Sequence, residues 1–558
     1  MPDTSRTLNN RLIYLAIFCM GIILYGKCLF FTLTHFDDTI LLEMNQTFLG
    51  NIKNLPKLFT TDVFISIVNP HIYYRPLLNL LFMIEAQIAP DNFLLYHGTN
   101  VLLHIFCCVL VFKLFQQMRF SQFLSAVAAL IFCVHPLNSS AVVWIPGRND
   151  TLVTCFVLGS FFFFLRAYDT KRRLDYIVHM LLFFLALLVK ETAIVLPILC
   201  FGYVYLVRGE KLRRRELVSM PAAYGLLTAC WFLMRITVHR GFEIQKTDGS
   251  LIATCVHNLP SYFLYIGKVF LPLDLSAFPN TTDHSLLPGI AVMLALAGVL
   301  YFVQFLSRPK ILFGFFWFFL FLSPTLIGEP IFYEHRAYCP LVGLLMAIAF
   351  IPVIRDMDFK KRVPLAGVAM VILILSLRTF VHEDCYQDRH SFSYTAYASA
   401  PSNDLSFICI ATMHLDEGNF DVAEQEIVQK IQQKPGLGVP HGMLADVYAS
   451  RREYECAAQE YERAIRLTPL NLTAYLHYGK MKIDEGQTDT AVQLWKKAVQ
   501  INPDFLVGYY YLANCYLRVK NDPDSAWVYV RELQQRGETV LPELLQAIET
   551  HPRFGKKH

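Results

Sequence analysis

The sequence predicts an all-α protein, in which a polytopic helical membrane domain is followed by an α-solenoid of tetratricopeptide (TPR) repeats. Hydrophobic residues make up 54% of the 558 residues and the mean hydropathy is +0.39, which is too apolar for an ordinary soluble protein of this size. The long apolar runs stop near residue 385. Beyond that point small residues and prolines recur every 34 residues, the period of TPR arrays: Pro435, Pro469 and Pro503; Ala423, Ala457 and Ala491; Ala411, Ala445, Gly479 and Ala513.

The first part of the chain contains eleven candidate membrane spans. A span needs about 20 apolar residues, and Pro76–Ile88 is apolar but shorter, which favours an interfacial helix. The first apolar run is too long for a signal-peptide core, so we expect it to remain as an anchor. The expected spans are 12–32, 93–113, 121–137, 151–167, 175–189, 191–207, 217–237, 286–306, 311–328, 338–354 and 364–381.

Basic residues between these spans predict the orientation. Short cytoplasmic loops carry an excess of Lys and Arg, and with a cytoplasmic N-terminus all the basic clusters fall on the cytoplasmic side. The opposite side then receives the TPR array and segments 33–92, 138–150, 238–285 and 329–337. We expect a bacterial inner membrane, with an endoplasmic reticulum membrane and a lumenal array as the alternative. The clusters are Lys113 and Arg119; Arg166, Lys171, Arg172 and Arg173; Arg208, Lys211, Arg213, Arg214 and Arg215; Arg308 and Lys310; Arg355, Lys360, Lys361 and Arg362.

The expected domains are a membrane domain over 1–385, a linker over 386–402 and a TPR domain over 403–558. Each repeat is a pair of amphipathic helices that bury their apolar faces by stacking on neighbours. The groove of such an array would bind an acceptor protein or peptide; alternatively the array packs only on its own membrane domain. Residues 403–537 carry 18 acidic and 14 basic side chains, so we expect no nucleic-acid partner. The expected repeats are 403–436, 437–470, 471–504 and 505–538, followed by a closing helix, Leu541–Glu549.

The first outer loop carries candidate catalytic residues. Asp37 and Asp38 follow the first span directly, where paired carboxylates can act as a general base or hold a cation. Alternatively they are solvated or cap a helix. The loop ends with Tyr74 and Arg75, and an arginine at the lip of the bilayer suits a phosphate, because its guanidinium forms bidentate bonds. The alternative is that Arg75 reaches toward lipid headgroups.

Further charged residues occur at three later positions on the same side. His135, Arg148 and Asp150 lie in the second outer loop, where Arg148 and Asp150 can instead pair with each other or cap the next helix. Lys190-Glu191 interrupts an apolar stretch, which indicates either a short outer turn or a buried site. The last outer loop carries Glu334-His335-Arg336, with Arg336 at phosphate depth.

These clusters together predict a site for a lipid-phosphate ligand. Ionisable residues beside a membrane are costly and often functional, and four separate loops present them at the same face. The 14 cysteines show no metal-ligand or disulfide spacing, and Cys107-Cys108 lies in an apolar run that predicts buried thiols. A glycine-rich phosphate loop is absent from the sequence, so we expect no nucleotide.

Five motifs occur in order along the membrane domain: Phe36-Asp37-Asp38; Tyr74-Arg75-Pro76-Leu77; Tyr96-His97 with Asn100-Val101-Leu102-Leu103-His104; His135-Pro136 with Gly147-Arg148 and Asp150; and Lys190-Glu191. In this order they resemble the transmembrane-and-TPR family of O-mannosyltransferase-like proteins. That resemblance implies a GT-C glycosyltransferase fold for residues 1–385.

The resemblance also implies a function and roles for the site residues. The donor would be a polyprenyl- or dolichyl-phosphate sugar, with mannose favoured, and the acceptors would be Ser and Thr hydroxyls of exported proteins. Asp37 and Asp38 would be catalytic. Donor and phosphate binding would fall to Tyr74, Arg75, His135, Arg148, Asp150, Lys190, Glu191, Glu334, His335 and Arg336. The resemblance implies no specific cofactor beyond the lipid-linked sugar donor, and a divalent metal on the two aspartates is possible but not favoured.

Three other functions remain open at this point. A non-catalytic scaffold could use the TPR array to gather secreted partners. A lipid-linked-sugar transporter would need ionisable residues deep within its spans, and few occur there. A third alternative keeps the GT-C enzyme but transfers the sugar to a glycan or lipid.

Overall fold

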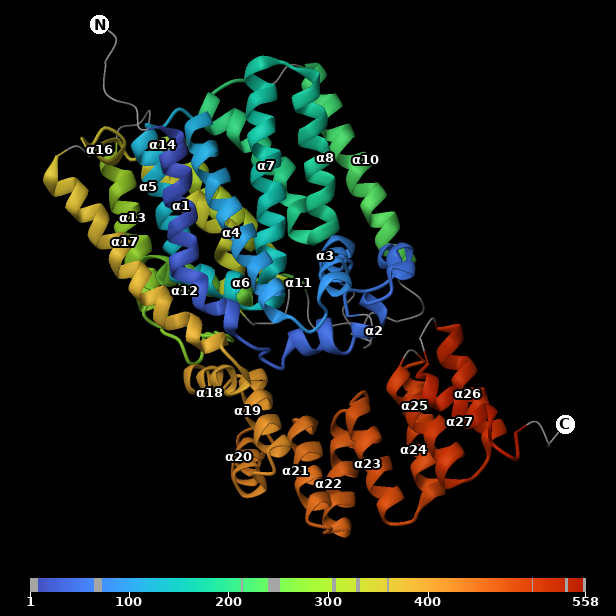
Figure 1. Ribbon diagram of the computed structural model, residues 1–558. Coiled ribbons are helices and arrows are strands. Elements are labelled where there is room, and N and C mark those ends of the chain that lie inside the picture. Colours follow the sequence, from blue (N-terminus) through green and yellow to red (C-terminus); the bar gives the residue numbers. More distant parts are fainter. Residues whose placement is uncertain are drawn as a thin grey trace, which may run out of the picture. The chain divides into compact units, whose positions relative to one another are not determined.

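The computed structural model describes residues 9–64, 73–211, 214–238, 251–303, 308–327, 332–358, 361–503, 505–536 and 540–554. These residues form helices joined by turns and loops, and no strand occurs among them. The chain divides into two compact units (Figure 1). The first comprises 1–42, 49–63 and 70–406, and the second comprises 43–48, 64–69 and 407–558. The all-α prediction is therefore confirmed.

The first unit contains the apolar helices. Figure 1 shows α4, α7, α8 and α10 side by side. Short 3-10 and π segments join the α-helices, which are α1 (Asn10–Tyr25), α3 (Pro76–Ile88), α4 (Phe93–Gln117), α5 (Gln122–Val134), α6 (Ser139–Val143), α7 (Arg148–Thr170), α8 (Arg173–Val189), α9 (Leu196–Gly202), α10 (Arg214–Val238), α11 (Leu251–Asn258), α12 (Ser261–Phe270), α13 (Leu287–Phe302), α14 (Arg308–Leu322), α15 (Tyr338–Ala349), α16 (Pro352–Arg355), α17 (Arg362–His382) and α18 (Arg389–Ser399).

Seven helices in the described residues are long and apolar enough to cross a membrane, or eight if a bent pair counts as one span. They match seven of the eleven expected spans. The expected span 121–137 is the bent pair. The other three expected spans fall on α8, α13 and α15, whose α-helical parts have 17, 16 and 12 residues. The short apolar segment Pro76–Ile88 forms α3 with the predicted bounds.

The bend lies between α5 and the following helical segment and measures 54°. A helix end inside an apolar unit exposes carbonyl groups that need partners. His104 Nε2 lies 3.0 Å from the carbonyl oxygen of Cys133, and Thr379 Oγ1 donates to that of Val134 at 2.7 Å. These bonds stabilise the break, after which the chain runs buried through α6 to Asp150 at the start of α7.

Two helices of the first unit pack backbone to backbone. Gly314 of α14 and Gly343 of α15 face each other, and a Cβ atom at Gly343 would lie only 2.6 Å from the carbonyl oxygen of Gly314. Such close approach through small residues is typical of helix pairs in membranes.

The second unit repeats a helical hairpin (Figure 1, orange to red). Gly418, Arg452 and Gly486 have positive φ at the same turn of successive hairpins, 34 residues apart, and Asn521 has it in the fourth. The alanines that recur with this period, such as Ala411 and Ala445, are fully buried. The helices are α19 (Asp404–Asp416), α20 (Phe420–Gln433), α21 (Gly438–Ser450), α22 (Tyr454–Leu467), α23 (Leu472–Asp484), α24 (Thr488–Ile501), α25 (Leu506–Asn514), α26 (Pro523–Gln535) and α27 (Pro542–Glu549).

The segment expected as a linker, 386–402, contains α18 and belongs to the first unit. Its hydrogen bonds fix it there: Ser399 Oγ lies 2.7 Å from Ser276 Oγ, and Ser402 Oγ donates to Asp283 Oδ2 at 2.7 Å. The boundary between the two units falls after Ser406.

Candidate functional site

Asp38 has a structural role in the first loop. Its side chain is 1% exposed. Oδ2 accepts hydrogen bonds from the backbone N and the hydroxyl of Thr34 at 2.6 and 2.9 Å, and Oδ1 accepts from the backbone N of Phe36 and Thr39 at 2.9 and 3.0 Å. Trp144 Nε1 donates to the same Thr34 hydroxyl at 3.1 Å. The four bonds hold the turn that presents Asp37, so Asp38 is a poor candidate for direct catalysis.

Asp37, unlike Asp38, is available for catalysis. It is half-buried, and no hydrogen bond or ion pair joins it to another described residue. Burial and the adjacent Asp38 raise the pKa of Asp37 to about 7 from 3.8, although Arg75 opposes the shift. A carboxyl group with a pKa near neutrality can accept a proton at physiological pH.

Arg75 forms an ion pair with Glu191. Its Nη2 lies 3.1 Å from Glu191 Oε1, and the exposed fractions of the two side chains are 12% and 35%. The buried Nε of Arg75 has no hydrogen-bond partner among the described residues. Because buried donors are almost always satisfied, this atom is available to a ligand oxygen.

A second ion pair lies next to the first. Lys190 Nζ donates to both carboxylate oxygens of Asp150 at 2.8 Å, and both residues are buried. His335 Nε2 lies 3.9 Å from Asp150 Oδ2, and its ring packs between those of Trp144 and Tyr333, at 5.7 and 5.1 Å between centroids. Burial, followed by the charges of Lys190, Arg336 and Arg75, lowers the pKa of His335 well below its usual 6.5.

Arg336 completes this arrangement. Its guanidinium carbon lies 5.0 Å from the centre of the Tyr333 ring. The charges of Arg336 and Asp150 both act on the phenol of Tyr265 in α12, which indicates that Tyr265 is close to both residues. Burial raises the pKa of this phenol. We call the resulting set the charged cluster: Asp37, Arg75, Asp150, Lys190, Glu191, His335 and Arg336.

Arg148 lies outside the charged cluster, contrary to expectation. The side chain is fully buried and ion-paired with Glu85 of α3. Its Nε donates to Asn100 Oδ1 at 2.6 Å, its Nη2 donates to the Tyr96 carbonyl oxygen at 2.7 Å, and its guanidinium stacks on Phe82. These contacts use the whole guanidinium group to join α3, α4 and α7, so it is not available to a donor phosphate.

Tyr74 and His135 also have structural contacts. Tyr74 is buried and its hydroxyl donates to the Phe59 carbonyl oxygen at 3.2 Å. His135 Nδ1 accepts from the backbone N of Leu137 at 3.3 Å, and Nε2 lies 2.9 Å from the Val269 carbonyl oxygen. Both residues stabilise loops next to the charged cluster and do not enter it.

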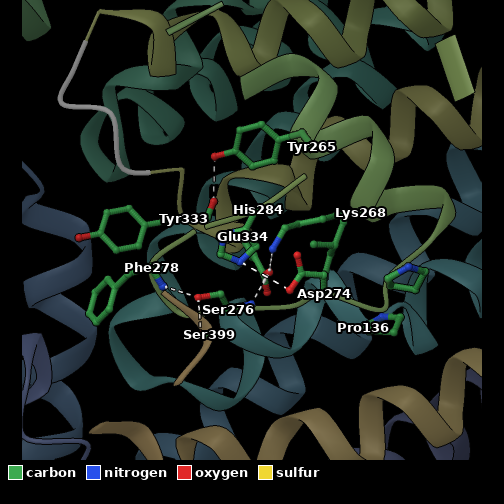
Figure 2. Close-up of polar contacts among 12 residues, drawn as sticks. Pro136, Tyr265, Lys268, Asp274, Ser276, Phe278, His284, Tyr333, Glu334 and Ser399 are labelled. Carbon is green, nitrogen blue, oxygen red and sulfur yellow. Dashed lines mark hydrogen bonds and ion pairs between the residues drawn. The ribbon is translucent and has the colours of Figure 1, made fainter. Parts of the chain in front are cut away.

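Glu334 is engaged outside the charged cluster, and Figure 2 shows its carboxylate next to Lys268. Its Oε1 accepts from Lys268 Nζ at 2.8 Å and from the backbone N of Ser276 at 2.7 Å. Its Oε2 lies 3.4 Å from His382 Nε2, without the angle of a hydrogen bond. Sequence reasoning missed Lys268 and Trp144, although a lysine in an otherwise apolar helix was a usable signal.

The acidic residues of the first loop do not fit a metal ion. Asp38 already accepts four hydrogen bonds, so it offers no free oxygen to share with Asp37. Within the described ranges, the group with mutual metal-ligand distances is His104, Cys108 and Cys133, in the interior of the first unit. His104 caps α5 there and lies 2.6 Å from the Tyr338 hydroxyl, so both its ring nitrogens are engaged.

Comparison with known proteins shows which sequences this chain resembles. The profile described as "Dolichyl-phosphate-mannose-protein mannosyltransferase" matches residues 76–242. The human protein O-mannosyl-transferase TMTC3 is 22% identical over 89% of this chain and 61% of its own length. The Caenorhabditis elegans protein O-mannosyl-transferase F38B6.6 is 29% identical over 43% of this chain and 34% of its own.

The chain is therefore similar over most of its length to protein O-mannosyl-transferases of the TMTC group. It spans 61% of the length of the human relative. Among solved structures, the crystal structure of MamA protein covers 28% of this chain and 87% of its own at 18% identity, with a TM-score of 0.23.

The charged cluster extends beyond the residues that the profile matches. Asp150, Lys190 and Glu191 lie inside residues 76–242, whereas Asp37 and Arg336 lie outside them. The fold therefore assembles the cluster from segments on both sides of the matched region, which no single stretch of sequence contains.

Proposed function

We propose that this protein is an integral-membrane glycosyltransferase that moves mannose from a dolichyl- or polyprenyl-phosphate donor to Ser or Thr hydroxyls of exported proteins. The observation that carries the proposal is the carboxyl group of Asp37, which no hydrogen bond joins to a described residue and whose pKa is near neutrality, beside Arg75, whose Nε has no partner in the described part of the chain. A proton acceptor and an anion-binding group are thereby adjacent, as glycosyl transfer from a phosphate requires.

The charge of the cluster supports a singly charged donor. Arg75, Lys190 and Arg336 carry three positive charges, and Asp150 and Glu191 carry two negative ones. With Asp37 protonated the cluster has one uncompensated positive charge. A sugar joined to a lipid through one phosphate has one negative charge, so its binding to this protonated form neutralises the cluster, and Asp37 loses its proton before the acceptor hydroxyl attacks. A lipid diphosphate would leave excess negative charge in a partly buried site, which is unfavourable.

The chemistry is a direct displacement at the anomeric carbon. The hydroxyl oxygen of the acceptor attacks C1 of the sugar, the bond from C1 to the phosphate oxygen breaks, and the lipid phosphate leaves with the bonding electrons. Arg75 and Lys190 stabilise the negative charge that develops on that phosphate, an effect worth about 3 kcal/mol for a well-placed donor. One displacement inverts the anomeric configuration.

Asp37 accepts the proton of the attacking hydroxyl. His335 is the other candidate base, but its pKa lies well below 6.5, so its imidazole is a weak proton acceptor. The pKa of Asp37, about 7, is better matched to neutral pH. A positioned base of this kind contributes roughly 10²–10⁴-fold to the rate. We assign His335 to a hydrogen bond with the donor sugar.

The orientation and the acceptor complete the proposal. The charged cluster and the helical repeats lie on the non-cytoplasmic side, of either an inner membrane or an endoplasmic reticulum membrane, and the N-terminus is cytoplasmic. The repeats bind the acceptor protein. Support comes from the basic residues of the alternate loops and from the mildly acidic repeats, which suit an exported polypeptide better than a nucleic acid.

The test is transfer by purified protein reconstituted with dolichyl-phosphate mannose and a peptide rich in Ser and Thr. Mass spectrometry of the peptide should show added hexose with the natural protein and about 10²-fold less or lower with Asp37→Asn. Asp274→Asn is the matched control, because this carboxylate lies in an outer loop with 63% of its side chain exposed.

Three outcomes would contradict the proposal. Equal transfer by Asp37→Asn would remove Asp37 as the base. If hexose appears on an added glycan or lipid and on no peptide, the protein is a glycosyltransferase whose acceptor is not a protein. A protein that binds exported partners but transfers no sugar would be a scaffold.

A further inference from the structure

Lys268 is a buried lysine with no place in the proposed reaction. It lies on α12, is 4% exposed, and directs its Nζ to Glu334 Oε1 at 2.8 Å (Figure 2). In the described part of the chain, no hydrogen bond or ion pair joins it to a residue of the charged cluster. A buried lysine is costly unless paired, which raises the question of what this pair fixes.

The Lys268–Glu334 pair fixes the turn that carries His335 and Arg336. Glu334 is 1% exposed and starts the 3-10 segment Glu334–Ala337. The same carboxylate oxygen that binds Lys268 also accepts from the backbone N of Ser276. Burial opposes ionisation of Glu334, but Lys268 and His382 together outweigh it and lower the pKa of Glu334 to about 2. The carboxylate therefore stays charged and tied to α12 and to the loop that follows it.

The next residue along this turn reaches the charged cluster. His335 Nε2 lies 3.9 Å from Asp150 Oδ2, and its ring lies against Trp144. Because Glu334 and His335 are consecutive, a shift of the Glu334 backbone necessarily moves His335 and Arg336. Tyr265, one helical turn before Lys268, donates to the carbonyl oxygen of Tyr333 at 3.0 Å, which holds the other end of the same turn.

We propose that Lys268 is a positioning residue, which sets the placement of His335 and Arg336 in the charged cluster through its ion pair with Glu334. This inference deepens the proposed function and rests on it for the effect on donor binding. The placement of His335 and Arg336 by Lys268 does not depend on the proposed function. A misplacement of about 1 Å in such a group can cost roughly 10²-fold in rate.

The test combines a local structural probe with donor binding. The protein is labelled with fluorotryptophan, and the Trp144→Phe variant identifies the Trp144 fluorine resonance. Lys268→Met should shift or broaden that resonance, since His335 moves away from Trp144, and should weaken binding of dolichyl-phosphate mannose about tenfold or more. Lys268→Arg keeps the charge and should restore much of both signals. Glu334→Gln keeps an acceptor oxygen for Lys268 and Ser276, so its effect on the Trp144 resonance and on donor binding should be smaller than that of Lys268→Met.

The matched control is Lys27→Met. Lys27 pairs with Glu383 and Asp384 at 3.3 and 2.7 Å, so its loss also strands a buried carboxylate, but it adjoins no residue of the charged cluster. This variant should lose stability and leave the Trp144 resonance and donor binding unchanged.

The outcomes separate this inference from the proposed function. An unchanged Trp144 resonance in folded Lys268→Met, or in Lys268→Arg if that is the variant that folds, would overturn the positioning role. A shifted resonance with unaltered donor affinity would overturn its effect on the donor. If Lys268→Met shifts the resonance but the natural protein binds no dolichyl-phosphate mannose, the positioning role is supported and the proposed function is wrong.

Discussion

Two adjacent aspartates at the end of the first span have different surroundings, and this difference defines the candidate site. Asp38 accepts four hydrogen bonds from Thr34, Phe36 and Thr39, and Asp37 is joined by none to a described residue. The bonds to Asp38 stabilise the turn. The cost of burying Asp37 beside it appears as a pKa near neutrality.

This division of roles predicts opposite effects of one substitution at two neighbouring positions. Asp38→Asn replaces one acceptor oxygen by an amide nitrogen, which cannot accept a hydrogen bond. The melting temperature should therefore fall, by the equivalent of about 3 kcal/mol for two lost bonds to a charged group. Asp37→Asn should leave the melting temperature unchanged or raise it, while sugar transfer is lost. Thermal unfolding in detergent measures both, and equal melting temperatures for the two variants would contradict the assignment.

The sequence indicated the residue types of the site but could not separate structural from available side chains. Arg148 and Glu85 are 63 residues apart, so their pairing depends on how α3 and α7 pack. The lone Glu85 within the apolar segment Pro76–Ile88 was a signal that a buried partner exists. Asp37, Arg75 and Lys190-Glu191 were found from their sequence positions because each lies at the end of an apolar run.

At the scale of helices, the position of each candidate membrane-spanning helix was predictable and its length was not. The hydropathy that predicted 338–354 continues through α15, a break and α16, because Pro352 starts a new helix. Likewise, the expected span 121–137 bends where Pro136 removes a backbone donor. The bend depends on His104 and Thr379 as distant carbonyl partners, which periodicity alone does not reveal.

Helix packing predicts a matched pair of glycine substitutions. In Gly343→Ala the new methyl group would meet the carbonyl oxygen of Gly314 and the backbone N of Phe318, at 2.6 and 2.9 Å, so α14 and α15 must separate. We expect a loss of about 1–3 kcal/mol in stability. Gly367→Ala on α17 has open space around it and should be neutral or stabilising. Urea or thermal unfolding compares them, and equal stability would argue against this packing.

At the scale of the whole molecule, the account requires the helical repeats to face away from the cytoplasm. The repeat period was predictable from proline and alanine spacing, and the turn residues Gly418, Arg452 and Gly486 recur with it. Which side of the membrane they occupy depends on the number of spans. Since α8, α13 and α15 are shorter than the other expected spans, orientation needs a direct measurement.

Cys456 provides that measurement. It is an exposed free cysteine on α22. A membrane-impermeant maleimide added to intact cells, or to vesicles sealed with the natural outer face outward, should label it, and Cys456→Ser should lose this label. Labelling only after the membrane is permeabilised would place the repeats in the cytoplasm and contradict the proposed orientation.

The central claim, that Asp37 is the base and Arg75 tunes it, is tested most directly by the pH dependence of kcat/KM for mannosyl transfer. Asp37 must be ionised to accept a proton, so the rate should rise with pH and level off above a midpoint near 7. Arg75 lowers the pKa of Asp37, so in Arg75→Gln the residual activity should have its midpoint at higher pH. A rate independent of pH between about 6 and 8, or a midpoint that Arg75→Gln leaves in place, would contradict the account.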